Sequence, residues 1–485
     1  MAPFDEPSPA ELHDDAAGTP RPRTADPAAA AHRPAEGPGL LALPEAESDV
    51  VELVRALIRI DTTNAGDRPE TMGEWAAAEY ADNALREAGF SPQRFATTSA
   101  SRAGLVLRIP GTDPDSADRA LLLHGHLDVV PAAPRGWTHP PFAAEVAVDP
   151  ESGLDMIWGR GAVDMKDMVG MILAVARHWA RTGMRPKRDV VVLLLPDEEH
   201  GGLAGSHWLV DHRPELFAGV TEAVGEVGGF SMTVRDDLRL YLVQTAERGM
   251  AWLQLRAAGR AGHGSMLNDD NAVTHLCQAV ARLGEHRFPV RVTPTTRAFI
   301  AELSDATGTD LDPLDAEGLI RVLGPLARIV GATLTNTMNP TMLSAGNKVN
   351  VIPGEATAAL DARFLPGHEE ELFAAIDQLL GDRVVREFIV HDEAVETTFD
   401  GPTVEAMAAA LRAHDPGARA VPYTLSAGTD AKAFSRLGIR CFGFAPLRLP
   451  PTLDFGSLFH GVDERVPIDG LQFGVRVLDR FLRSC

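Results

Sequence analysis

The sequence of 485 residues has few cysteines, no excess of positive charge and no long uninterrupted apolar run. Its three cysteines, Cys277, Cys441 and Cys485, form no CxxC pair, which excludes a disulfide scaffold and favours a reducing compartment. The formal net charge of -23 leaves no basic stripe for nucleic acid or an anionic membrane surface. No apolar segment is long enough to span a membrane, and the acidic start MAPFDEPSPAELHDD is unlike a signal peptide. We therefore expect a cytoplasmic protein.

Composition and periodicity divide the chain into four segments. Residues 1–44, rich in Ala, Pro, Arg and acids without apolar periodicity, are predicted to be a disordered leader. In residues 45–246, aliphatic strands alternate with amphipathic helices, which predicts an α/β domain with a mixed, mostly parallel sheet and helices on both faces. Residues 247–398 follow a β-α-β-β-α-β order, which predicts an inserted ferredoxin-like α+β domain. The α/β pattern then resumes in residues 399–485 and completes the first domain.

Loops that carry acids or histidines follow apolar strands or strand-like segments at five places: His126-Leu127-Asp128, Asp164, Glu198-Glu199, Glu226 and His460. Each of them alone is typical of a helix cap or a solvated loop. Ligand sites in such sheets lie beyond the carboxyl ends of the strands, so we expect the five loops to converge. Two imidazoles and at least three carboxylates crowded together require cations, and this donor set suits zinc, with cobalt or manganese as alternatives.

The number of donors favours two metal ions. One histidine and one terminal carboxylate are available for each ion, and one carboxylate remains to bridge ions about 3.5–4 Å apart. One choice of ligand stays open, because side-chain alternation along a strand allows His124 to share a face with His126. His126 lies nearer the strand end and is the preferred ligand.

A series of short motifs occurs in a fixed order along the chain: HGHLDVVP (124–131), Trp137 with PPF (140–142), GRGAVDMKDM (159–168), PDEEHGG (196–202), GE (225–226), GHGS (262–265), NVIP (350–353), DAR (361–363), AGTDA (427–431) and FHGVDE (459–464). By these motifs the chain, from about residue 48 to its end, resembles the M20 metallopeptidases and deacylases. That family includes aminoacylases, acetylornithine deacetylase, succinyl-diaminopimelate desuccinylase and glutamate carboxypeptidases.

The resemblance implies a dinuclear zinc centre with one bridging carboxylate, Asp164. The five implied ligands are His126, Asp164, Glu199, Glu226 and His460. Asp128 would orient His126 through the second ring nitrogen of the imidazole. Glu198 would be the general base for attack by metal-bound hydroxide on a carbonyl carbon.

The resemblance also assigns residues outside the cluster. His263 in GHGS would reach the active site of a partner subunit and stabilise the oxyanion, which implies a homodimer that forms through the inserted domain. Asn350, Arg363 and Gly428 would contact substrate, with Arg363 suited to a bidentate grip on a carboxylate. Ala427 stands where relatives often have glycine.

These inferences predict a dinuclear zinc hydrolase of the N-acyl amino acid deacylase type, which cleaves an amide next to a carboxylate-bearing residue. A zinc dipeptidase or carboxypeptidase on the same scaffold is one alternative. A catalytically inactive binding protein is another, although such a protein should lack the base or a ligand, and all of these residues are present. The expected partner is a small N-acyl amino acid or short peptide, with no nucleic acid and no membrane.

Overall fold

The computed structural model describes residues 42–66, 68, 71–312, 331 and 333–485. The predicted leader therefore lies outside the described residues as far as residue 41. Helix α1 (Pro44–Arg59) starts with a proline, at a position where a missing N–H costs no helical hydrogen bond. In the described part of the chain, no helix is both long and apolar enough to cross a bilayer.

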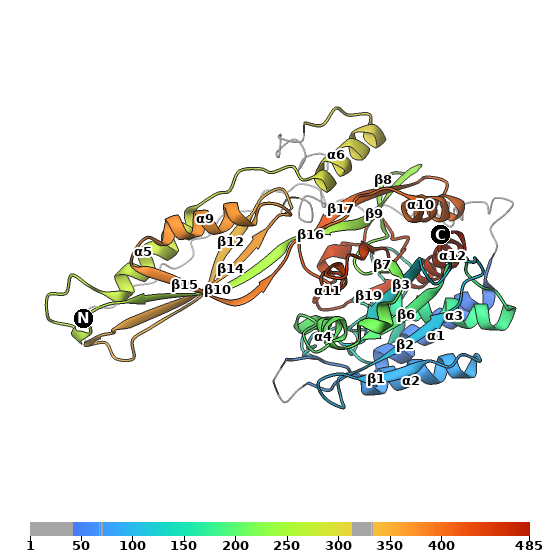
Figure 1. Cartoon of the computed structure of the whole chain (residues 1–485), viewed down its shortest axis with the longest axis horizontal. Helices are drawn as coiled ribbons and strands as arrows, with labels where there is room; N and C mark the ends of the chain where they lie inside the picture. The colour runs from blue at the N-terminus through green and yellow to red at the C-terminus, as the bar shows by residue number, and fades with distance from the viewer. Residues whose placement is uncertain (1–41, 67, 69–70, 313–330, 332) are drawn as a thin grey trace, which may run out of the picture. The chain divides into compact units, whose positions relative to one another are not determined.

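Among the described residues, ten strands form one sheet (Figure 1). In order across the sheet, eight of them are β1 (Gln93–Ala96), β2 (Ala103–Ile109), β6 (Val190–Leu195), β3 (Ala120–His126), β7 (Val220–Gly225), β18 (Arg440–Gly443), β9 (Leu238–Glu247) and β16 (Val395–Glu396). The other two, β17 (Ala418–Leu425) and β8 (Phe230–Arg235), also pair with β9. The central strands β6, β3, β7 and β18 are parallel, and antiparallel strands flank them. The predicted mixed sheet is confirmed.

Helices cover both faces of this sheet. Alternate residues of the central strands point to opposite faces and are buried in two separate cores. Leu121 and Leu123 of β3 lie in the larger core, whereas Leu122 lies in the smaller one. The helices of the larger core are α1, α2 (Trp75–Glu87), α3 (Lys166–Thr182), α6 (Pro294–Thr307), α10 (Pro402–His414) and α12 (Ile468–Ser484). Those of the smaller core are α4 (Ser206–His212) and α11 (Ala431–Ser435).

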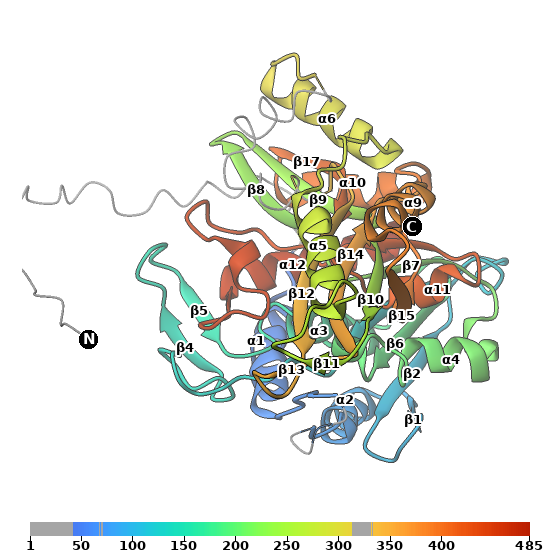
Figure 2. The same cartoon turned by 90° about the vertical axis from the view of Figure 1, so that its left-hand side faces the viewer.

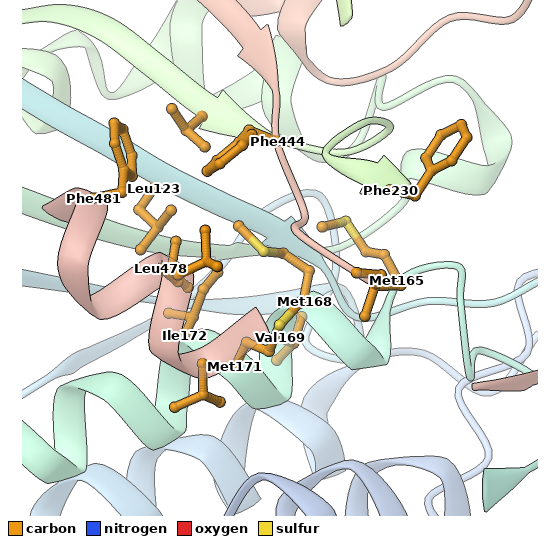
Figure 3. Packing of buried hydrophobic residues seen from close by; sticks show 14 of the residues in the cluster. Leu123, Met165, Met168, Val169, Met171, Ile172, Phe230, Phe444, Leu478 and Phe481 are labelled. Carbon is orange, nitrogen blue, oxygen red and sulfur yellow. The ribbon is translucent and has the colours of Figure 1, made fainter. Parts of the chain in front are cut away.

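Helix α3 packs at the centre of the larger core. Figure 3 shows its methionines and aliphatic residues beside Leu478 and Phe481 of α12. At Gly170 the helix crosses α1 so closely that an added Cβ would lie 2.4 Å from Val54 Cγ2. This packing fixes the N-terminal end of α3, and Asp164 lies in the loop that leads into it.

A second sheet of four antiparallel strands has the order β12 (Thr337–Ala345), β14 (Glu355–Phe364), β10 (Gly249–Ala258) and β15 (Val384–Asp392). Helices α5 (Ala272–Glu285) and α9 (Glu369–Leu380) pack on one face of it, as Figure 2 and Figure 1 show. The four strands of this sheet and the two helices packed on it follow one another along the chain as β10-α5-β12-β14-α9-β15, which confirms the predicted inserted α+β unit. The exact boundaries at residues 247 and 398 stay a prediction.

An excursion separates α5 from β12 within this unit. Its described part contains helix α6 (Pro294–Thr307), whose first turn is capped by the hydroxyl of Thr293. Residues 313–330 and 332, inside the segment 296–340 whose shape the sequence leaves open, lie outside the described residues.

Candidate metal centre

Three neighbouring parallel strands deliver acidic and histidine side chains to one edge of the large sheet. Strand β3 ends at His126, β6 is followed by a short 3₁₀ turn with Glu198 and Glu199, and Glu226 comes directly after β7. Because these strands run in the same direction, their carboxyl ends lie at the same edge. Asp164 arrives from the loop between β5 (Asp155–Trp158) and α3.

The side chains of the cluster approach one another at distances typical of ligands around a shared cation. His126 Nε2 lies 3.1 Å from Asp164 Oδ1 and 3.2 Å from Glu226 Oε2. His460 Nε2 lies 3.2 Å from Asp164 Oδ2 and 3.1 Å from Glu199 Oε2. The two oxygens of Asp164 therefore face different histidines, which is the geometry expected of a bridging carboxylate.

Glu198 lies slightly farther from the first histidine than the other acids do. Its Oε2 is 3.9 Å from His126 Nε2. Two sets of three donors, each set within 4.8 Å, could hold a metal ion: His126, Glu198 and Glu226, and His126, Asp164 and Glu199. Imidazole with carboxylate is a donor set that suits zinc and other divalent transition metals.

The protonation behaviour of the cluster reflects its excess of negative charge. Burial raises the pKa of Glu226 to about 8, and burial together with the charge of Glu226 raises the pKa of Glu198 well above its usual range. Hydrogen bonds to Asp164 and Glu199 raise the pKa of His460 to about 10. The cluster therefore concentrates buried negative charge, which a bound divalent metal ion would compensate.

Asp128, predicted to orient His126, has a wider set of contacts. His126 Nδ1 lies 3.0 Å from the backbone oxygen of Asp128 and 3.6 Å from its carboxylate. The carboxylate accepts hydrogen bonds from the backbone N–H groups of Glu198 and Glu199, at 3.1 and 3.0 Å. Asp128 therefore connects His126 to the turn that carries both glutamates.

A buried polar network supports Asp128, and motif analysis did not find it. Asn64 Nδ2 donates to Asp128 Oδ2 at 2.8 Å and to Asp197 Oδ1 at 3.1 Å. Arg102 Nη2 donates to Asn64 Oδ1 at 2.8 Å, and its Nη1 pairs with the fully buried Glu74. Asn64 and Arg102 lie outside the quoted motifs, in the polar stretches DTTNAGD and TTSASRAG, where no sequence signal distinguishes them from their neighbours.

A second buried pair, Arg160 with Glu464, joins two ligand loops. Glu464 accepts from Arg160 Nη1 at 2.5 Å and from the backbone N–H groups of Gly161 and Val163 at 3.1 and 2.8 Å. Arg160 Nη2 also donates to the backbone oxygen of Gly461, next to His460, at 2.9 Å. Both residues belong to motifs that the sequence displays, GRG and FHGVDE, but sequence reasoning gave them no role.

His124 does not belong to the cluster. Its ring packs against Phe434 of α11 with centroids 4.9 Å apart, and burial lowers its pKa to about 3. Strand β3 ends at His126, and of the two histidines in this strand it is His126 whose imidazole reaches the acids at the sheet edge. The choice that the sequence left open therefore falls on His126.

The remaining predicted residues fall into two groups. Gly428 lines the pocket beside the cluster, as do all five candidate ligands except the buried His126. His263 and Asn350 are exposed at β11 (Gly262–His263) and just before β13 (Val351–Ile352), which pair with each other. Arg363 of β14 makes a double hydrogen bond to Asp361. His263, Asn350 and Arg363 are not among the residues that line that pocket, so their roles stay predictions.

Comparison with known proteins agrees with the fold and the cluster. The model of peptidase family M20/M25/M40 matches residues 122–484. Aminoacylase-1 of Homo sapiens is 27% identical over 448 residues, which cover 90% of this chain and 96% of that protein. The N-fatty-acyl-amino acid synthase/hydrolase PM20D1 of Xenopus tropicalis is 26% identical over 470 residues, 90% of this chain and 85% of that protein.

Among solved structures, the M20 family metallo-carboxypeptidase Sso-CP2 from Sulfolobus solfataricus has the same fold, with a TM-score of 0.65 at 17% identity over 90% of this chain and 99% of that one. The family match spans most of the chain, and it includes the strand ends that carry the cluster. The chain therefore belongs to peptidase family M20/M25/M40 and is a hydrolase of amide bonds.

Proposed function

We propose that this enzyme is a dinuclear zinc hydrolase that removes the acyl group from N-acyl amino acids. The observation that carries the proposal is the position of Asp164 between two histidines, with one oxygen facing His126 and the other facing His460. The similarity to aminoacylase-1 and to PM20D1, both named for N-acyl amino acid chemistry, supports this substrate class.

The charge of the cluster supports two ions rather than one. Four acids, Asp164, Glu198, Glu199 and Glu226, face two histidines, so even two protonated imidazoles leave negative charge uncompensated. Two divalent ions would balance four carboxylates with both imidazoles neutral. In this assignment His126 and Glu226 would hold one ion, His460 and Glu199 the other, and Asp164 both. Bound zinc ions polarise a carbonyl group and lower the pKa of water to about 7; cobalt or manganese would serve similarly.

Glu198 is the proposed general base. Its backbone is fixed through Asp128, and its carboxylate lines the pocket beside the cluster. The carboxylate takes a proton from the attacking water as the water oxygen bonds to the carbonyl carbon. It then delivers that proton to the amide nitrogen as the C–N bond breaks, which releases the acid and the free amino acid.

We also propose a homodimer in which His263 of the partner subunit donates to the developing oxyanion. Strand β12 lies at the edge of the four-stranded sheet, with Met342 and Leu343 exposed by 72% and 59%. An exposed apolar edge strand is a surface that a second copy can extend. The three cysteines are free, in keeping with the expected cytoplasmic location.

The test is a screen of N-acyl amino acids and dipeptides with zinc-loaded protein, together with metal analysis. We expect hydrolysis of N-acyl amino acids to free amino acids and two zinc ions per chain. Preferred cleavage of dipeptides would instead support the dipeptidase alternative, and active protein without bound transition metal would contradict the proposal.

A further inference from the structure

A pocket of about 290 Å³ opens beside the metal cluster, and its far wall is apolar. The wall is formed by Val227, Phe230, Tyr423, Leu425 and Phe459. Phe230 and Leu425 are only 5% and 9% exposed, so their positions are fixed by the surrounding core. The volume is near the lower end of the roughly 300–1,000 Å³ that small-molecule sites occupy, which suits a small group rather than a long chain.

The wall offers no partner for a charged group. Among the described residues that line the pocket there is no lysine or arginine, and apart from Tyr423 the ionisable side chains are those of the cluster itself. Tyr423 has the one phenolic hydroxyl of the wall, and that hydroxyl donates to the backbone oxygen of Val227 at 2.8 Å.

One lysine, Lys432, lies behind the loop at Gly428, and its ammonium group is already paired. Lys432 is buried; its Nζ lies 2.7 Å from Asp392 Oδ2 and donates to the backbone oxygen of Arg248 at 2.9 Å. Burying a carboxylate without a partner is strongly unfavourable, so the apolar wall of the pocket disfavours any substrate group that bears a negative charge.

An N-acyl amino acid has two halves on either side of the scissile bond, and only the amino acid half must carry a carboxylate. The apolar wall therefore suits the acyl half, and the carboxylate must bind elsewhere. We propose that this pocket is the acyl site and that it selects uncharged, apolar acyl groups over acidic ones. This inference rests on the proposed deacylase function and names the substrate class within it.

Two substrates of similar shape distinguish a preference for apolar acyl groups from a preference for acidic ones. An N-succinyl and an N-(4-methylpentanoyl) derivative of one amino acid differ only in a terminal carboxylate against an isopropyl group. We expect kcat/KM to be on the order of 100-fold higher for the 4-methylpentanoyl substrate, because the carboxylate would be desolvated without a cation. From acetyl to butanoyl, kcat/KM should rise about fourfold per added methylene, until the pocket is filled.

Ala427 provides a matched pair of variants to test the charge argument. It is exposed, it lines the pocket, and it directly precedes Gly428. Ala427→Lys places a cation at the pocket and should raise the ratio of succinyl to 4-methylpentanoyl turnover at least about tenfold. Ala427→Met, of similar length and no charge, should leave that ratio unchanged; thermal melting of both variants checks that they fold.

The outcomes distinguish this inference from the proposed function. If the wild-type enzyme hydrolyses the succinyl substrate as well as the 4-methylpentanoyl one, the apolar acyl site is wrong while the deacylase function stands. If the zinc-loaded enzyme hydrolyses no N-acyl amino acid but cleaves dipeptides, the proposed function and the inference both fail. If Ala427→Lys and Ala427→Met change the ratio of succinyl to 4-methylpentanoyl turnover equally, the effect does not depend on charge, and the inference is also overturned.

Discussion

Replacing Glu198 by glutamine separates the role of a base from that of a metal ligand. The two roles are both geometrically open, because Glu198 shares one possible donor set with His126 and Glu226. The distances favour the base: Glu198 Oε2 is 3.9 Å from His126 Nε2, against 3.1 Å for Asp164 and 3.2 Å for Glu226. Glutamine keeps the shape of the side chain and removes its ability to accept a proton.

The expected loss follows from the chemistry of proton transfer. A positioned general base contributes about 10²–10⁴-fold to the rate, so kcat of Glu198→Gln should fall by that factor. This corresponds to roughly 2.7–5.4 kcal/mol of transition-state stabilisation. The backbone N–H of Glu198 still donates to Asp128, so the turn and the neighbouring ligand Glu199 should remain in place.

The assay measures steady-state hydrolysis of an N-acyl amino acid and zinc content in the same preparation. We expect Glu198→Gln to retain as much zinc as the wild-type enzyme. Glu199→Gln is the matched control, because it removes the negative charge of a carboxylate whose oxygen lies 3.1 Å from His460 Nε2 and should therefore reduce the zinc content. Substantial turnover by Glu198→Gln, or zinc loss equal to that of the Glu199 variant, would refute the assignment of Glu198 as base.

Three further predictions address other parts of the molecule. His263→Ala mixed with Glu198→Gln should recover roughly a quarter of wild-type activity, since half of the dimers are mixed and each has one intact site; no recovery would contradict a shared site. Glu464→Gln should weaken zinc binding about 10–100-fold in a metal titration, because it loosens the loops of the bridging Asp164 and of His460; an unchanged zinc affinity would contradict this. Asp415→Asn should lower the free energy of unfolding by about 1.5–3 kcal/mol at pH 7 in urea denaturation, because Asp415 accepts from Arg239 and Tyr241. Although burial opposes it, these bonds lower the pKa of Asp415, so the difference should shrink as the pH falls below about 4; a difference that persists there would refute the linkage.

Sequence patterns predicted the parts of this enzyme that depend on local order along the chain. Aliphatic strands followed at once by polar residues identified the ends of β3, β6 and β7, and parallel strands bring such ends to one edge. His126, Glu198 and Glu226 therefore meet as the strand pattern implies. The β-α-β-β-α-β order of the inserted unit was equally visible, because alternate residues of its strands are apolar and buried.

The sequence did not reveal contacts between residues that are far apart in the chain and have no motif. Asn64 reaches Asp128 across 64 positions, and Arg102 reaches Asn64 across 38. Nothing in the local sequence of either residue indicates its partner, since the pairing depends on how α1 packs against the sheet and on which strands β2 pairs with in it. The hydrogen bonds that Asp128 accepts from backbone N–H groups could not be predicted from the sequence either, because every residue but proline has such a group.

The buried ion pair of Arg160 and Glu464 is better explained by geometry than by stability. Replacing a buried ion pair by apolar residues of similar size often leaves stability unchanged or raises it, so folding alone gives little reason for Arg160 and Glu464 to be buried together. Their hydrogen bonds, however, reach the backbone on both sides of the cluster, beside Asp164 and beside His460. The position of a ligand relative to its neighbours determines metal affinity. It follows that a conservative change in this pair should alter metal binding before it alters the melting temperature.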